Sequence, residues 1–209
     1  MIGRALVSVL VIALPAVASA QAGLPPDPGT HFLLEIEGGL ASSSADYLDL
    51  GWSFGGTVGI GGKFRGFPPR FYAIGNYRSS LYTGGGVHWA TGVPFDAWEA
   101  NHELTAGLRV VFPLWSRIFR LSTEIRGGTL GHTATLDRPG ARTLQTTSWK
   151  GVLVLGAGLQ ARWHPNAAVG LGIEWAKADT EPDVVAAAAG YQGAGDERVS
   201  VFLTNTWFF

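Results

Sequence analysis

The chain ends with the stretch V-S-V-F-L-T-N-T-W-F-F, from Val199 to Phe209. Every second residue counted back from Phe209 is apolar, with the exception of Asn205. Alternation with a period of two predicts a β-strand whose two faces differ chemically. Chain ends usually fray into water, so an apolar and aromatic terminal strand favours a strand that ends at a membrane interface.

This stretch resembles the C-terminal assembly signal of bacterial outer-membrane barrels, in which a final phenylalanine follows apolar residues at every second position. The residues that carry the resemblance are Val201, Leu203, Trp207 and Phe209. The resemblance implies that the barrel-assembly machinery is a partner of this strand. Asn205 departs from the pattern, and we expect its polar side chain to face lipid.

The amino terminus has the pattern of a secretory signal peptide over residues 1–20. One positive charge precedes an apolar run, and Ala18-Ser19-Ala20 forms a small-residue cleavage site. The apolar run is shorter than the roughly 20 residues that a transmembrane helix needs. We therefore expect residues 1–20 to be cleaved, residues 21–29 to be a periplasmic lead-in, and residues 30–209 to form the barrel.

The composition favours an all-β chain that binds neither nucleic acid nor a cofactor. Glycine accounts for 30 of the 209 residues, about twice its average share. The formal net charge is −1, so the sequence gives no basic surface for nucleic acid. Cysteine is absent, which excludes disulfides. The histidines lack metal-ligand spacing.

Alternation of apolar and polar residues predicts seven more strands upstream of the last one. We expect them at about 30–40, 52–64, 70–80, 98–112, 117–129, 149–163 and 167–177. Short turns near Phe67, Trp115 and Pro165, about 50 residues apart, alternate with longer loops. The predicted loops span 41–51, 81–97, 130–146 and 179–197. This pattern predicts an eight-stranded antiparallel transmembrane β-barrel of up-and-down topology, with short periplasmic turns and long extracellular loops.

The position of the charged residues decides which face of each strand meets lipid. A basic side chain in lipid costs about 2–4 kcal/mol at the bilayer midplane, whereas opposite charges can pair inside a narrow barrel. We therefore expect the apolar faces outside and a charge network in the lumen. The predicted members of this network are Glu35, Glu37, Lys63, Arg78, Glu99, Glu103, Arg109, Arg120, Glu124, Arg126, Lys150, Arg162 and Glu174.

Tryptophans mark the expected edges of the lipid-facing band. Trp149 and Trp163 bound the apolar stripe of the sixth strand, and Trp175 ends that of the seventh, so we assign all three to aromatic girdles. His102 lies on the apolar stripe of the fourth strand, which predicts a position at the external headgroup interface. In the third strand, where both faces carry aromatic residues, we place Asn76 and Arg78 inside.

By its architecture the mature chain resembles the small eight-stranded outer-membrane barrels of the OmpA-transmembrane-domain and OmpX type. The resemblance implies residence in the outer membrane of a Gram-negative bacterium, with lipid and lipopolysaccharide around the wall. A structural role, or an interaction with an extracellular partner through the loops at 81–97 and 179–197, is the expected function.

Two other functions compete with this expectation. Side chains can fill the interior of an eight-stranded barrel, so we expect a plugged lumen, and a narrow channel for small or apolar solutes is the alternative. The third hypothesis is a lipid-modifying enzyme. A deacylase would need a histidine beside a serine nucleophile, and no serine lies two residues after His132. We therefore expect no enzymatic activity.

Overall fold

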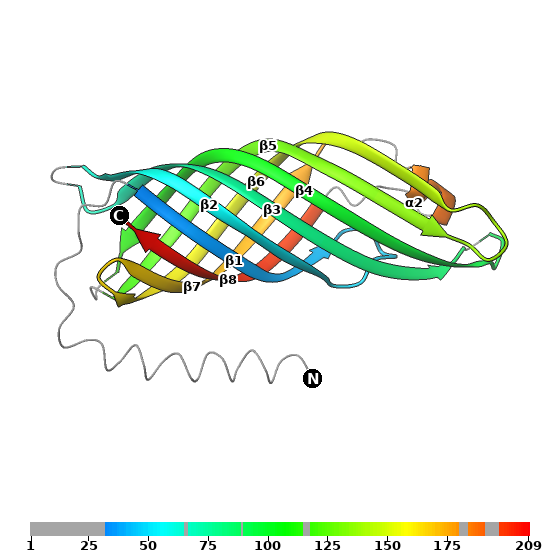
Figure 1. Ribbon diagram of the computed structural model, residues 1–209, viewed down its shortest axis with the longest axis horizontal. Coiled ribbons are helices and arrows are strands. Elements are labelled where there is room, and N and C mark those ends of the chain that lie inside the picture. The colour runs from blue at the N-terminus through cyan, green and yellow to red at the C-terminus, as the bar shows by residue number, and fades with distance from the viewer. Residues whose placement is uncertain (1–31, 65–66, 89, 115–117, 180–183, 191–196) are drawn as a thin grey trace.

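Eight strands form one closed antiparallel barrel in the computed structural model, which describes residues 32–64, 67–88, 90–114, 118–179, 184–190 and 197–209 (Figure 1). The strands are β1 (Phe32–Ser43), β2 (Gly51–Lys63), β3 (Arg70–Val87), β4 (Pro94–Pro113), β5 (Phe119–Asp137), β6 (Leu144–His164), β7 (Ala167–Ala178) and β8 (Glu197–Phe208). Neighbours in the chain are neighbours in the sheet, and β1 closes the ring by pairing with β8. The predicted up-and-down barrel is confirmed. The predicted signal peptide, lead-in and Trp115 lie outside the described residues.

The two faces of the strands follow the alternation of the sequence. Large apolar side chains are exposed on the outside, for example Ile36, Ile60 and Leu104, at 55, 67 and 62 %. Charged and polar side chains are buried inside, and in β3 these include Asn76 and Arg78, as predicted. An apolar exterior around a polar interior is the arrangement of a barrel that is surrounded by lipid.

The strands differ in length, and the longer ones continue beyond the rest of the barrel. β1, β2, β7 and β8 have 12 or 13 residues, whereas β3 to β6 have 18 to 21. A tilted strand of about 10 residues already crosses a bilayer. β3 to β6 therefore extend past the lipid-facing band, at the end away from the carboxyl terminus (Figure 1). We call this part the protruding sheet; it comprises residues 79–87, 94–103, 129–137 and 144–151.

Most of the predicted loops at 81–97 and 130–146 belongs to the protruding sheet, so those two predictions are wrong. The strands leave only residues 88–93 and 138–143 between them. Glycine and threonine in these segments resemble loop sequence, but most of them pair across neighbouring strands here. Outside the lipid, a strand no longer needs an apolar outer face, and the alternation that identifies it is lost.

An apolar cap fills the mouth of the barrel at the protruding end. Helix α2 (Val184–Ala189) and the segment between β1 and β2 pack together against β4 and β5. The packed residues are Ala45, Tyr47, Phe95, Ala97, Ala134, Leu136, Val185 and Ala189. The predicted loop at 179–197 thus contains a helix that closes the lumen. No helix among the described residues is long and apolar enough to cross a membrane.

The opposite end of the lumen is closed by a second apolar layer. Its members come from β1, β3, β4, β7 and β8, and they are Leu33, Tyr72, Ile74, Val111, Ala168 and Phe208. The guanidinium of Arg120 lies 4.6 Å from the centre of the Phe208 ring. The charged side chains in the middle of the lumen are therefore shielded at both ends.

Candidate functional site

A connected set of ion pairs occupies the middle of the lumen. Arg126 of β5 lies at its centre, with Nη2 2.6 Å from Oε1 of Glu174 and Nε 3.0 Å from Oε1 of Glu124. Arg78 pairs with the other oxygen of Glu174 and, at 2.7 Å, with Glu37. All these side chains are buried, so solvent screens the pairs little.

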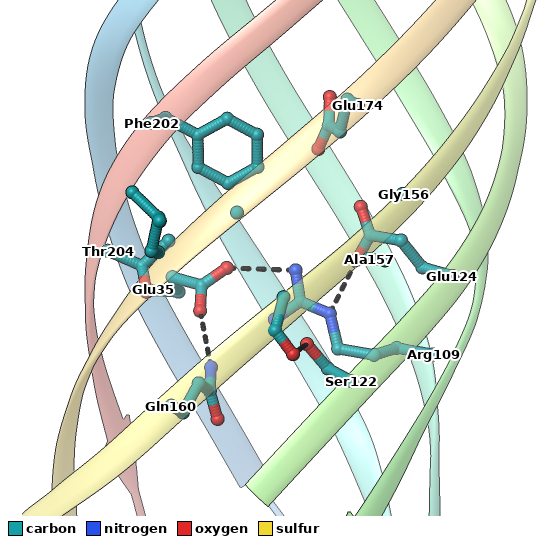
Figure 2. A pocket seen from close by; sticks show the side chains of 13 residues that line it. Glu35, Arg109, Ser122, Glu124, Gly156, Ala157, Gln160, Glu174, Phe202 and Thr204 are labelled. Carbon is teal, nitrogen blue, oxygen red and sulfur yellow. Dashed lines mark hydrogen bonds and ion pairs between the residues drawn. The ribbon is translucent and has the colours of Figure 1, made fainter.

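The network continues toward β4 and β8. Arg109 lies between two carboxylates, 2.8 Å from Glu35 and 2.6 Å from Glu124, as Figure 2 shows. On the other side, Arg198 pairs with Glu103, which also lies 3.6 Å from the central arginine. The connected set thus joins five carboxylates to four guanidinium groups from six strands.

Neutral side chains donate additional hydrogen bonds to the carboxylates of the network. Gln160 and Thr206 donate hydrogen bonds to Glu35 at 3.2 and 2.5 Å, and Asn76 donates one to Glu37 at 3.0 Å. Buried ion pairs offset their desolvation cost only when such additional hydrogen bonds are present. The polar residues opposite the apolar stripes therefore have a structural purpose.

Glycine makes room for the network on the inner wall. A Cβ atom at Gly156 would lie 2.8 Å from Cγ of Glu124 and 3.1 Å from Cγ of Glu174. Any larger residue at this position of β6 would displace these two carboxylates from Arg126. The high glycine content of the chain thus reflects close packing inside the barrel as well as turns.

The structure places four of the other predicted lumen residues inside the barrel, toward its two ends. Glu99 and Lys150 are buried toward the protruding end. Arg120 and Arg162 are buried toward the other end, where Arg162 donates a hydrogen bond to the carbonyl of Pro165 at 3.0 Å. Lumen charge is therefore spread along the whole barrel, with the ion-pair network in the middle.

Lys63 is where the structure departs from the predicted set. It is the last residue of β2, and its side chain is exposed. At the end of a strand the lumen opens to water, so facing inward does not imply burial. The prediction that Lys63 belongs to the charge network is wrong.

Several interior residues are absent from the predicted set. Arg70 and Arg198 are buried, and each lies at the first or second residue of its strand. His132 falls in a predicted loop, yet it is buried in β5, where Nδ1 forms a 2.8 Å hydrogen bond with Oδ1 of Asn101. Counting back from Phe202 in steps of two along β8 reaches Arg198, so alternation alone predicts that Arg198 faces inward.

A small cavity lies in the middle of the lumen. The cavity in Figure 2 has a volume of about 20 Å³ and lies among Arg109, Glu124, Gln160 and Phe202. That volume accommodates about one water molecule. Within the described ranges, no group of three or more His, Cys, Asp or Glu side chains is arranged to hold a metal ion.

This packing gives an expected result for ion conduction. The purified barrel should produce no sustained single-channel currents in a planar bilayer, because the charge network and both apolar layers obstruct the lumen. A wide porin inserted under the same conditions is the positive control. Sustained currents from the wild-type barrel would rule out the plugged lumen and favour the narrow-channel alternative.

On the outer wall, the rings of Tyr77, His102 and Trp149 lie across the base of the protruding sheet, and we call them the aromatic row. Register pairs align Ser79, His102, Gly131 and Trp149 across β3 to β6. The ring of His102 stacks on that of Tyr77 at 6.3 Å, and a 2.9 Å hydrogen bond joins Nδ1 to the tyrosine hydroxyl. The ring of Trp149 lies against Gly131, where a Cβ would be 3.1 Å from it.

Comparison with known proteins identifies the fold. No protein-family profile matches the chain, and no curated protein does. Among solved structures, a major outer membrane protein from Thermus thermophilus has a TM-score of 0.57 at 12 % identity, over 87 % of this chain and 100 % of that one. Ail, the attachment invasion locus protein of Yersinia pestis, has a TM-score of 0.50 at 16 % identity, over 87 % and 99 %. This chain has the fold of the small outer-membrane β-barrels.

A third similar structure is the outer membrane protease OmpT from Escherichia coli. Its TM-score is 0.51 at 11 % identity, over 78 % of this chain and 65 % of OmpT. At such identities the likeness between these outer-membrane barrels is one of fold. It does not transfer the proteolytic activity of OmpT to this chain.

The aromatic residues assigned to girdles lie on the outside of this outer-membrane barrel fold. Trp149 and Trp163 are 68 and 47 % exposed, near opposite ends of β6, and Trp175 is partly exposed near the end of β7. Tyr77 and His102 add to the row at the protruding end. These positions suit side chains with an apolar ring and a polar atom at a membrane interface.

The C-terminal strand lies in the wall of the barrel as an ordinary member of the ring. Its outward residues Val201, Leu203 and Phe209 are exposed, and Trp207 is partly exposed. Asn205 also faces outward, between Ile36 of β1 and Val169 of β7. The residues that resemble the assembly signal therefore form one stripe on the exterior, and their recognition by the assembly machinery stays a prediction.

Proposed function

We propose that this protein is a cell-surface recognition barrel, which the lipid-facing wall anchors in the outer membrane while the protruding sheet binds an extracellular protein. The binding site is the edge of β6 beyond the end of β7, and the ligand is an extended segment of the partner. The observation that supports this proposal is the difference between the two edges of the protruding sheet.

The edge of β3 is covered by the segment between β1 and β2. Backbone hydrogen bonds run from Asp49 N to Thr83 O at 2.8 Å and from Gly85 N to Tyr47 O at 3.0 Å. Leu48 forms an antiparallel bridge between them. Covering an edge in this way protects a sheet from pairing with other chains.

Among the described residues, no strand continues the pairing with β6 beyond the end of β7. Pairing of β7 stops at Val152, and the contacts of Gly151 with Asp179, at 2.9 and 3.1 Å, are the next ones along β6. Within the part of the chain that the structure describes, the stretch 144–150 has no strand on this side. Alternate residues of a strand point their backbone N–H and C=O groups to the same side. Those of Gln145, Thr147 and Trp149, like those of Gly151, therefore point away from β5, to the side where β7 would continue.

The composition of this edge favours strand addition. The stretch from Leu144 to Trp149 reads L-Q-T-T-S-W, with neither charge nor proline, and the only charge of the open stretch is Lys150, which is buried in the lumen next to the end of β7. Threonine and tryptophan also favour extended structure. An added strand gains affinity from backbone hydrogen bonds, so such an edge recognises an extended uncharged segment.

A second copy of the barrel in the same membrane does not fit this edge. Barrels inserted in one direction are related by rotation about the membrane normal, so their tilted β6 strands point the same way along the normal and cannot be antiparallel. Closed two-fold pairing of identical edges requires antiparallel strands. A copy in the same membrane is therefore excluded, and the proposed partner is a protein presented from outside the cell.

The proposal is tested with a synthetic peptide of alternating threonine and valine, added to the barrel in phospholipid nanodiscs. We expect binding to slow amide hydrogen exchange at Gln145, Thr147 and Trp149. Gln145→Pro removes one edge donor and should weaken binding about tenfold, as the loss of one good hydrogen bond would. Gln145→Ala is the matched control, since it removes the side chain and keeps the donor. Equal binding by both variants would refute the edge as the site.

A further inference from the structure

The outer face of the protruding sheet is a second surface, which uses the side chains of Thr147 and Trp149 where the edge of β6 uses their backbone groups. We propose that it binds the uncharged sugar units of a glycolipid whose acyl chains lie in the adjacent leaflet. We call this surface the sugar face. Its residues are Tyr77, Trp98, His102, Thr133, Thr147 and Trp149.

Two aromatic levels with small residues between them make up the sugar face. The lower level holds the stacked Tyr77 and His102 and, across Gly131, Trp149. Trp98 forms the upper level on β4 and is 38 % exposed. It lies four residues from His102, which corresponds to about 13 Å along the strand.

Hydroxyl groups lie between these aromatic levels. Thr133 and Thr147 are register partners on β5 and β6, and their hydroxyl oxygens are 3.3 Å apart. Ala100 is the neighbour of Thr133 on β4, so no large side chain separates the hydroxyls from Trp98. The surface is therefore flat enough for a sugar ring to lie on it.

This combination of groups suits a neutral sugar. The negative face of an aromatic ring attracts the weakly positive C–H bonds on one side of a pyranose. Threonine hydroxyls and a histidine ring nitrogen can exchange hydrogen bonds with the sugar hydroxyls. Exposed tryptophan provides a large contact area with few rotatable bonds, which limits the entropy lost on binding.

The charges around the sugar face disfavour an anionic ligand. Among the described residues of the protruding sheet, no lysine or arginine faces outward. The outward charges are Asp96 and Asp137, which are register partners above Trp98. On the sheet itself, phosphate or sulfate groups would meet these two carboxylates, whereas Arg138 and Arg142 belong to the connection between β5 and β6.

Continuity with the lipid-facing wall selects a membrane-anchored glycolipid. Tyr77 is the register partner of Leu104, which is 62 % exposed, and below it the wall continues with Ile125 and Leu155. Acyl chains packed on this wall would bring a headgroup to the aromatic row. A phospholipid headgroup ends near that row, whereas a chain of sugars extends up to Trp98.

The test uses the full mature barrel in nanodiscs, with and without lipopolysaccharide in a phosphatidylcholine bilayer. We expect lipopolysaccharide to shift the indole N–H resonances of Trp98 and Trp149, and to leave that of Trp163 unchanged. Chemically dephosphorylated lipopolysaccharide should produce the same shifts, because neutral sugars carry the recognition. Shifts that vanish on dephosphorylation, or that phosphatidylglycerol alone reproduces, would overturn the proposal.

A pair of variants gives a second readout. The double variant Trp98→Ala, Trp149→Ala should retain about tenfold less lipopolysaccharide in native mass spectrometry, and Trp163→Ala, the matched control, should retain as much as the wild type. Equal retention by the double variant would also overturn the proposal. Gln145→Pro should still show the lipopolysaccharide shifts, so failure of the peptide edge and failure of the sugar face are distinguishable.

Discussion

Replacing Arg126 with alanine is expected to destabilise the barrel by about 3–5 kcal/mol, because a buried ion pair that loses one partner leaves an uncompensated charge. Arg126 is 1 % exposed and lies within ion-pair distance of Glu103, Glu124 and Glu174. Its removal therefore weakens the compensation of three buried carboxylates at once. The free energy of unfolding in urea, measured on the refolded barrel, gives this cost.

Lys177→Ala is the matched control for Arg126→Ala. Lys177 pairs with Glu197 at 3.1 Å, but the two side chains are 53 and 48 % exposed. An exposed pair contributes about 0–1 kcal/mol. If the two variants lost similar stability, the lumen network would be no more important than a surface pair. Adding Glu174→Gln to Arg126→Ala should recover part of the loss, since one of the three carboxylates that lose compensation is then neutral.

Phe208→Ala is the second substitution with a large expected effect, about 3–5 kcal/mol of lost stability. Phe208 is 1 % exposed, packs in the apolar layer with Leu33 and Tyr72, and lies under the guanidinium of Arg120. Its removal leaves a cavity and deprives a buried cation of its aromatic partner. Urea unfolding of the refolded variant measures this loss.

The neighbouring residue provides the contrast for Phe208. Phe209 faces outward and is 64 % exposed, so Phe209→Ala should change the free energy of unfolding by less than about 1 kcal/mol. If the resemblance to the assembly signal holds, this variant should instead lower the amount of folded barrel in cells, read as heat-modifiable migration on a gel. If Phe209→Ala lost much stability and showed no assembly defect, the assignment of stability to Phe208 and of assembly to Phe209 would be contradicted.

Alternation identified the barrel because lipid imposes one rule on every spanning strand. Wherever a strand crosses the apolar band, as around Leu104 and Ile125, its outward residues must be apolar and its charges must turn inward. The same rule placed Arg126 and Glu174 inside before any pairing was known. Which arginine pairs with which glutamate depends on register across several strands, and a sequence read one strand at a time does not contain that information.

The requirement for apolar outward residues no longer applies where strands leave the membrane. In the stretch from Thr129 to Leu136, threonine and glycine face outward while His132, Ala134 and Leu136 face inward, so neither face has a uniform character. The cap could not be predicted for a different reason. It joins Tyr47 to α2, about 140 residues away in the chain, through packing that leaves no periodic pattern.

The unequal lengths of the strands also set a height. About eight residues of each long strand extend beyond the lipid, and at the usual rise and tilt they stand about 20 Å above it. A partner must come within this distance of the bilayer to reach the edge of β6. Long surface polysaccharides would sterically exclude large proteins from that zone, so a thin extended segment can enter where a folded domain cannot. The thickness of the glycan coat would then decide when the barrel is accessible.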